Sequence, residues 1–184
     1  LAELGIDYQI AAGTSIGAIN ACLMAQEDLE LAQSLWETIT VDQVMAEGIN
    51  FEPSIRAMLN QMKNLGPFLK KFINSKGADI SPLIQLLDQV IDEEKLRRSP
   101  IDFGLVTVRT TPMKAIELSR GEIPEGELRN YLLASAACFP AFPMYQIGDN
   151  RFVDGGYYDN LPVSLAIKMG AEEIVAIDLD CNGT

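Results

Sequence analysis

The spacing of apolar residues along the chain predicts helices that alternate with short strands. Small or apolar residues at helical spacing predict helices at 16–26, 28–38, 127–137 and 162–169, and a further helix that starts at Ser81-Pro82. Short apolar runs predict strands at 8–12, 103–108, 114–118, 145–147 and 151–153. Alternation of this kind is typical of an α/β domain.

The run at 173–178 is the most continuous apolar stretch near the C-terminal end. Its internal residues are all apolar, with an acidic residue on either side. Strands that are covered on both faces have such continuous runs, so we expect a strand in the interior of a parallel sheet. No internal repeat, low-complexity segment or linker interrupts the chain, and 1–184 is therefore interpreted as one domain.

Residues 53–77 combine apolar residues at helical spacing with an unbalanced charge. The segment has no acidic residue, and its basic residues are Arg56, Lys63, Lys70, Lys71 and Lys76. A basic amphipathic helix pair can lie on a lipid surface or cover an apolar cleft, so peripheral contact with a membrane is one expectation. An ordinary helical hairpin whose lysines face solvent explains the same pattern.

The overall charge disfavours one class of partner. The 184 residues are enough for one domain with a core, and 26 acidic against 14 basic residues give a net charge of −12. Binding to nucleic acid requires a basic face that neutralises phosphates, so nucleic acid is not expected as a partner. The molecule as a whole is not attracted to anionic lipid either.

The numbers of cysteine and histidine residues limit the possible catalytic chemistry and indicate the cellular compartment. Cys22, Cys138 and Cys181 are odd in number and lack metal-ligand spacing, so we expect buried thiols in a reduced, cytoplasmic protein. No run of 18 apolar residues occurs, so no membrane-spanning segment is predicted. The sequence contains no histidine, so no histidine is available to bind a metal or to activate a serine. The base for a nucleophilic serine would have to be Asp, Glu or Lys.

The main chemical motif is Gly-x-Ser-x-Gly at 13–17, between a predicted strand and a predicted helix. This context is that of a nucleophile elbow, in which Ser15 occupies a tight turn with its hydroxyl exposed. Gly13 and Gly17 are expected to be small because the turn leaves no room for side chains. The N–H groups of Ile16 and Gly17 would lie at the helix N-terminus, where unpaired donors suit a developing oxyanion. A glycine-rich turn with a structural serine would produce the same pattern.

A second constellation, Val-Asp-Gly-Gly at 153–156, places an aspartate at the end of a predicted strand. Functional side chains of α/β proteins gather at strand ends, and Gly155 and Gly156 would let another group approach the backbone closely. Asp154 could therefore accept the Ser15 proton, provided that burial raises its reference pKa of about 4. A plain Asp-Gly turn is the structural alternative. Weaker candidates for the base follow the last predicted strand: Asp178 and Asp180.

Together, the serine elbow, the later Asp-Gly-Gly and the lack of histidine resemble the patatin-like phospholipase family, specifically its bacterial members. The resemblance runs through most of the chain: GTSIGA at 13–18, SAACFPAFP at 135–143, FVDGGYYDNLPV at 152–163 and GAEEIVAIDL at 170–179. It implies a three-layer α/β/α fold with a mostly parallel central sheet, and it implies no metal and no organic cofactor.

The resemblance also implies roles for individual residues. In that family an elbow serine and the aspartate of Asp-Gly-Gly form a catalytic dyad, so Ser15 would be the nucleophile and Asp154 the base. The expected activity is hydrolysis of a carboxylic ester in a lipid or phospholipid through an acyl-serine intermediate. Residues of an apolar loop would line the acyl site: Phe139, Pro140 and Phe142. Two residues match the family's Asn-x-Pro and are interpreted as structural: Asn160 and Pro162.

One departure from the family concerns a glycine-rich loop, with an Arg or Lys, that lies upstream of the elbow and supplies the rest of the oxyanion hole. In the family this loop would lie just before Leu1. The domain at 1–184 is therefore expected to lack this loop and some C-terminal structure.

Two other functions remain open at this point. An acyltransferase of the malonyl-carrier type also uses a serine elbow, but its chemistry normally relies on histidine. A non-catalytic lipid- or protein-binding module would retain the fold, and residues 53–77 could provide its contact surface. Such a binding module is the main alternative to an enzyme.

Overall fold

The computed structural model of the protein describes residues 4–44 and 78–178, and all structural statements below refer to these residues. The basic stretch at 53–77 lies outside them, as do Asp180 and Cys181. Within the described ranges, no helix combines the length and the hydropathy needed to cross a bilayer.

The described strands form one five-stranded sheet around β2. The strands are β1 (Ile10–Thr14), β2 (Asp102–Thr110), β3 (Met113–Ser119), β4 (Tyr145–Ile147) and β5 (Asn150–Asp154). β3 follows β2 in an antiparallel hairpin and occupies one edge of it. On the opposite edge, β1 pairs parallel with 102–106 of β2 and β5 pairs antiparallel with 107–109. β1 and β5 therefore share one edge of β2 and run toward each other, because they pair with successive segments in opposite directions.

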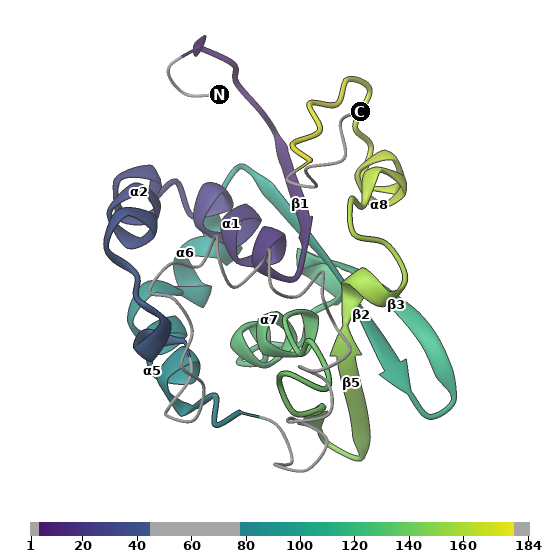
Figure 1. Cartoon of the computed structure of the whole chain (residues 1–184). Coiled ribbons are helices and arrows are strands. Elements are labelled where there is room, and N and C mark those ends of the chain that lie inside the picture. The colour runs from purple at the N-terminus through teal and green to yellow at the C-terminus, as the bar shows by residue number, and fades with distance from the viewer. Residues whose placement is uncertain (1–3, 45–77, 179–184) are drawn as a thin grey trace, which may run out of the picture.

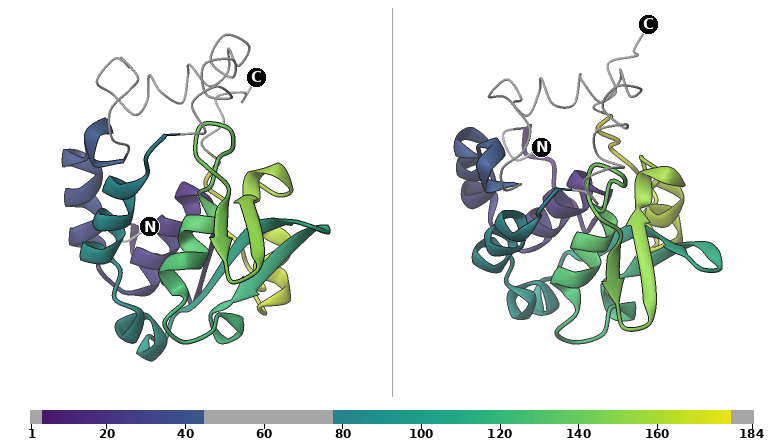
Figure 2. Two further views of the ribbon diagram at one scale, coloured as in Figure 1. Left: turned by 90° about the horizontal axis from the view of Figure 1, so that it is seen from below. Right: turned by 60° about the horizontal axis from the view of Figure 1, so that its bottom comes forward.

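Helices cover both faces of this sheet. The larger layer contains α1 (Ile16–Ala25), α2 (Leu29–Thr38), α5 (Ser81–Val90), α6 (Glu93–Arg98) and α7 (Leu128–Ser135), and α8 (Val163–Lys168) lies on the other face (Figures 1 and 2). Short 3-10 turns lie at Val41–Gln43, Arg120–Glu122 and Gly155–Tyr157. The three layers expected from the sequence are thus present.

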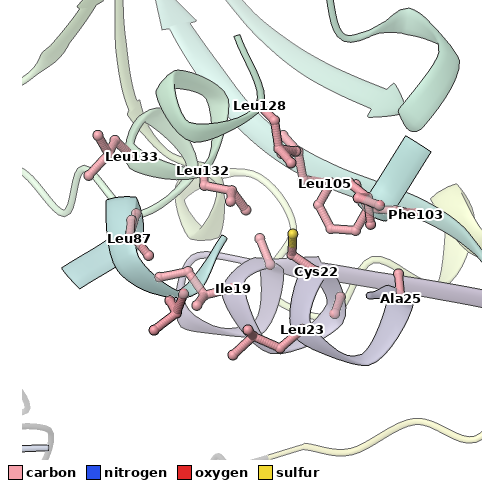
Figure 3. Packing of buried hydrophobic residues seen from close by; sticks show 14 of the residues in the cluster. Ile19, Cys22, Leu23, Ala25, Leu87, Phe103, Leu105, Leu128, Leu132 and Leu133 are labelled. Atoms are coloured by element: carbon pink, nitrogen blue, oxygen red, sulfur yellow. The ribbon is translucent and has the colours of Figure 1, made fainter. Parts of the chain in front are cut away.

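Side-chain alternation along β2 explains the two layers. Phe103 and Leu105 are fully buried and belong to the main apolar cluster, whereas a side chain at Gly104 would meet Leu165 and Met169 at the α8 face. Successive residues of a strand point to opposite faces, so β2 packs against both helical layers at once. Figure 3 shows the larger core, which joins Cys22 of α1 to residues of α5, α7 and β2. Its labelled members include Ile19, Leu23, Leu87, Leu128 and Leu132.

The α/β class predicted from the sequence is confirmed, but strand pairing differs from the expected mostly parallel sheet. Among the described strands, only β1 and β2 pair in parallel, and the other three pairings are antiparallel. For two of these three, the reason is the length of the connections. β2–β3 and β4–β5 are joined by two residues each, and a turn of that length can only join antiparallel neighbours.

The strand predicted at 173–178 is wrong for the described structure. This segment forms no strand, and the side chains of Ile174, Val175 and Ile177 are 39%, 60% and 61% exposed. A continuous apolar run indicates a buried strand only where a neighbouring strand pairs with it and both faces are covered. None of the described strands pairs with 173–178.

Candidate active site

The turn between β1 and α1 has the strand–turn–helix form predicted for the elbow. β1 ends at Thr14, α1 begins at Ile16, and Ser15 between them has φ 57° and ψ −126°. A non-glycine residue at positive φ is strained, and such strain is typical of serine elbows. The conformation persists only because the surrounding structure holds it.

The two glycines of the elbow have different reasons to be small. A Cβ atom at Gly13 would lie 2.1 Å from the carbonyl oxygen of Gly17, so no side chain fits there. A Cβ atom at Gly17 would have no atom within 4 Å among the described residues other than its chain neighbours and the backbone of its own helix. The steric expectation is therefore confirmed for Gly13 and wrong for Gly17, which lies on the open side of the turn.

The side chains of Ser15 and Asp154 meet where β1 and β5 end. The hydroxyl of Ser15 donates a hydrogen bond of 2.5 Å to Oδ2 of Asp154, and Oδ1 accepts one of 2.7 Å from the N–H of Gly156. Asp154 is 6% exposed, and this burial raises the pKa of its carboxyl, while the two hydrogen bonds act in the opposite direction. The balance is a carboxyl group with a higher pKa than an ordinary aspartate, in contact with a serine hydroxyl.

Gly155 allows the segment after Asp154 to pass close to the sheet. A Cβ atom at Gly155 would lie 2.2 Å from the carbonyl oxygen of Val106 and 2.8 Å from Cγ2 of Thr14. At Gly156, a Cβ atom would lie 3.1 Å from Oδ1 of Asp154. Both glycines therefore act as the sequence suggested, by permitting close approach of backbone and carboxylate.

A further hydrogen bond ties the loop after Asp154 to the elbow. The hydroxyl of Thr14 is buried and donates to the carbonyl oxygen of Asp159 at 2.8 Å. Thr14, the residue before Ser15, thus connects the elbow to the turn that follows Asp154. Asn160 lies in the same turn, with its Oδ1 3.2 Å from where a Cβ atom at Gly156 would lie.

Ser135 is a site residue that the sequence reasoning missed. Its side chain is fully buried at the end of α7, where Oγ accepts the N–H of Ser15 at 2.9 Å and donates to the carbonyl oxygen of Val106 at 2.7 Å. The only signal in the sequence is a hydroxyl within the apolar end of a predicted helix, at the first position of SAACFPAFP.

Four backbone N–H groups follow Ser15 in the first residues of α1. The N–H groups of Ala18 and Ile19 donate to the carbonyl oxygen of Ser15, at 2.9 and 3.4 Å. Within the described residues, the N–H groups of Ile16 and Gly17 have no acceptor. These are the two donors that the sequence suggested for an oxyanion, and they lie at the positive end of α1.

The apolar loop after α7 adjoins Asp154. The carbonyl oxygen of Ala137 accepts the N–H of Asp154 at 2.9 Å, and the carbonyl oxygen of Phe139 accepts the hydroxyl of Tyr157. Of the three residues expected to line an acyl site, Phe139 is 41% exposed, Pro140 is half-buried, and Phe142 is buried in the core. Phe139 is therefore the member of the set that is most accessible to a ligand.

The two cysteines in the described ranges are free thiols. Cys22 is buried in the core, and Cys138 is partly buried. Burial, together with the negative charge of Asp154, raises the pKa of Cys138 to about 11. This thiol is therefore protonated near neutral pH and is a poor nucleophile.

We also searched the described ranges for metal sites and for other pockets. No group of three or more His, Cys, Asp or Glu side chains in these ranges is arranged to hold a metal ion. A pocket at the opposite end of α1 contains no residue of the dyad and is lined by polar and charged residues, among them Gln26, Asp92, Glu94, Lys95 and Arg98. Lys95 and Arg98 are paired there with Asp28 and Glu94.

Comparison with known proteins agrees with the sequence motifs. The family model for patatin-like phospholipase matches residues 1–167. Patatin-like phospholipase domain-containing protein 7 is 28% identical in Mus musculus and 26% identical in Rattus norvegicus, each over 181 residues. These alignments cover 97% of this chain, which spans only 12% of the length of each relative.

Proposed function

Because this chain belongs to the patatin-like phospholipase family, we propose that it is a lipid acyl hydrolase with a Ser15–Asp154 dyad. The observation that carries the proposal is the 2.5 Å hydrogen bond between the Ser15 hydroxyl and the Asp154 carboxylate, at a strained strand-to-helix turn. Family membership supports a lipid ester as the substrate class.

The first half of the reaction forms an acyl-enzyme. Ser15 Oγ attacks the ester carbonyl carbon while Asp154 accepts the hydroxyl proton. The tetrahedral oxyanion is stabilised by the N–H groups of Ile16 and Gly17. Asp154 then gives its proton to the departing alcohol, which leaves the acyl group on Ser15.

The second half releases the fatty acid. Asp154, again ionised, takes a proton from a water molecule that attacks the acyl carbonyl carbon. Collapse of the second tetrahedral intermediate returns the proton to Ser15. The raised pKa of Asp154 supports this cycle, because a base is most effective when its pKa lies near the working pH.

The surroundings of the dyad support an apolar acyl chain. Phe139 and Tyr157 expose aromatic surface beside the dyad. The hydroxyl of Tyr157 donates a hydrogen bond to the backbone carbonyl oxygen of Phe139. The glycine-rich loop expected upstream of the elbow remains a prediction. Loss of a single oxyanion donor typically costs about 100-fold to 1000-fold in turnover, so that loop would strongly affect the rate.

The remaining partner and location predictions are part of the same proposal. Contact of residues 53–77 with a membrane, a cytoplasmic location and a likeness to bacterial members of the family remain predictions. The described residues and the mammalian relatives test none of them.

A direct test measures esterase activity on a medium-chain p-nitrophenyl ester with the wild-type protein and with Ser15→Ala. Ser34→Ala in α2 is the matched control, because it removes a hydroxyl from an exposed residue of another helix. We expect Ser15→Ala to abolish turnover and labelling by a fluorophosphonate ester, and Ser34→Ala to retain both. An inactive, unlabelled wild type would instead favour a non-catalytic binding module, and labelling that persists in Ser15→Ala would place the nucleophile elsewhere.

A further inference from the structure

We propose that Ser135 is a positioning residue that holds the Ser15 nucleophile in its reactive conformation. This inference rests on the proposed function, since it assigns a role in the reaction of Ser15. Its basis is geometric: a fully buried hydroxyl joins the N–H of Ser15 to the carbonyl oxygen of Val106. Ser135 does not touch the reacting atoms and acts through the backbone of Ser15.

The hydrogen bonds of Ser135 fix the direction of its hydroxyl. A serine hydroxyl has one proton to donate, and here the carbonyl oxygen of Val106 accepts it at 2.7 Å. The oxygen lone pairs are then free to accept the N–H of Ser15 at 2.9 Å. The Ser135 hydroxyl therefore both donates and accepts a hydrogen bond in the protein interior, where an unsatisfied polar group is destabilising.

The strained backbone of Ser15 explains why such support is needed. At φ 57° the residue is outside the conformations that side chains normally adopt, and rotation toward them would swing Oγ away from Asp154. On the C-terminal side, the carbonyl oxygen of Ser15 is held by Ala18 and Ile19 of α1. On the N-terminal side, Ser135 is the group that holds the N–H.

The same end of α7 also supports the other member of the dyad. Two residues beyond Ser135, the carbonyl oxygen of Ala137 accepts the N–H of Asp154 at 2.9 Å. The end of α7 and the residues just after it thus contact the backbone of both Ser15, which follows β1, and Asp154, the last residue of β5. Ser135 is the side chain in this support, so its removal tests the arrangement without touching either catalytic group.

The hydrogen bond to Ser135 also distinguishes the N–H group of Ser15 from the N–H groups of the two residues that follow it. The N–H of Ser15 is committed to Ser135, whereas those of Ile16 and Gly17 have no acceptor among the described residues. If Ser135 is removed, the N–H of Ser15 loses its partner and the turn can relax. Both the direction of Oγ and the direction of the two oxyanion donors then change.

The test compares Ser135→Ala with the wild type and with Cys22→Ala. Cys22 is the matched control because it is also fully buried, and it lies in the later turns of α1, where its Sγ donates to Gln26. Steady-state kinetics on a p-nitrophenyl ester give kcat and KM, and a fluorophosphonate ester gives the rate of the first covalent step. Amide hydrogen exchange by NMR reports whether the N–H of Ser15 is still protected.

We expect Ser135→Ala to lower kcat and the maximal phosphonylation rate by about 10-fold to 100-fold, since small misplacement of a reacting group has effects of this size. KM should change less than about twofold, because the substrate surface is unaltered. Exchange should become faster at Ser15 but not at Ala18. Cys22→Ala should keep the wild-type kinetics. If Ser135→Ala does not fold, Ser135→Cys is measured instead. Its loss of kcat should be smaller than the loss expected for Ser135→Ala.

The outcomes separate this inference from the proposed function. A reactive wild type together with a Ser135→Ala variant of equal kcat and equal Ser15 protection would overturn the positioning role and leave the proposed function intact. A decrease of the same size in Cys22→Ala would also overturn it, because the loss would then be a general effect of core damage. A wild type that neither turns over esters nor reacts with the probe would overturn the proposed function and, with it, the role of Ser135 in catalysis.

Discussion

Thr14 and Asp154 end two strands that run toward each other along the same edge of β2. Thr14 pairs with Val106 and Asp154 pairs with Thr107, so the two strand ends occupy adjacent positions. The parallel direction of β1 and the antiparallel direction of β5 bring both C-terminal ends to one point. This geometry delivers Ser15 to Asp154 across 139 positions of sequence.

The role of Asp154 as a base can be tested with an isosteric substitution. Asp154→Asn preserves the size of the side chain but cannot accept the proton of Ser15. We expect kcat to fall by about 100-fold to 10,000-fold, the usual contribution of a general base, with little change in KM. Asp149→Asn in the exposed β4–β5 turn is the control and should retain wild-type kinetics. A kcat for Asp154→Asn within threefold of the wild type would exclude this base.

Activity should depend on pH through Asp154. The reaction requires the ionised carboxylate, and burial raises the pKa of this group. We therefore expect kcat/KM to rise with pH through a transition that lies above the ordinary aspartate value of about 3.9. A pH–rate profile of the wild type checks this. A profile already flat from pH 4 upward would contradict a raised pKa.

The contribution of Asp154 to folding stability should depend on pH in the opposite direction to activity: it should decrease as pH rises. Because its pKa is higher in the folded state, the folded protein binds the proton of Asp154 more tightly than the unfolded chain. The contribution of Asp154 to stability is then complete below about pH 3.9 and declines as pH rises through the raised folded pKa. Asp154→Asn should remove this decline, so the Tm of the variant should gain on that of the wild type from pH 4 to pH 8. A constant Tm difference over this range would contradict the prediction.

The two glycines of the elbow should respond differently to alanine. Gly13→Ala places Cβ 2.1 Å from a backbone oxygen, and we expect a loss of about 1–3 kcal/mol in the free energy of unfolding, together with loss of activity. Gly17→Ala meets open space at the start of α1, so its stability should be unchanged or increased by up to about 1 kcal/mol. Urea unfolding of both variants is the measurement. Equal losses would mean that the open side of the turn is covered in the folded protein.

Gln26 should be important for stability but not for chemistry. Its buried amide donates to the carbonyl oxygen of Val90 and accepts the N–H of Asp92, at the end of α1 remote from Ser15. Gln26→Leu leaves both backbone groups unpaired, at a cost of about 1–3 kcal/mol each. We expect lower stability in urea unfolding and unchanged kcat/KM below the unfolding temperature. A fall in kcat/KM would show that damage to the end of α1 reaches Ser15.

Local patterns were enough to predict much of the fold and to single out Ser15 and Asp154, whose side chains meet in the structure. The elbow could be predicted because its constraint lies in five neighbouring residues, and the strands at 103–108 and 114–118 could be predicted because each is a short apolar run. The steric need for Gly13 was also a local property of the turn. In each case the interacting residues are close in sequence, so periodicity and turn chemistry record them.

Ser135, Gly17 and the segment at 173–178 show what required the tertiary structure. The importance of Ser135 depends on α7 ending beside the elbow, and the space at Gly17 depends on what packs against it. The apolar run at 173–178 has the composition of a buried strand, yet it forms no strand, because none of the described strands pairs with it. The sequence by itself determined the α/β class and pointed to Ser15 and Asp154 as the pair that we propose to react. Only tertiary structure decided how the two meet, since strand order and register arise from contacts between residues far apart in the chain.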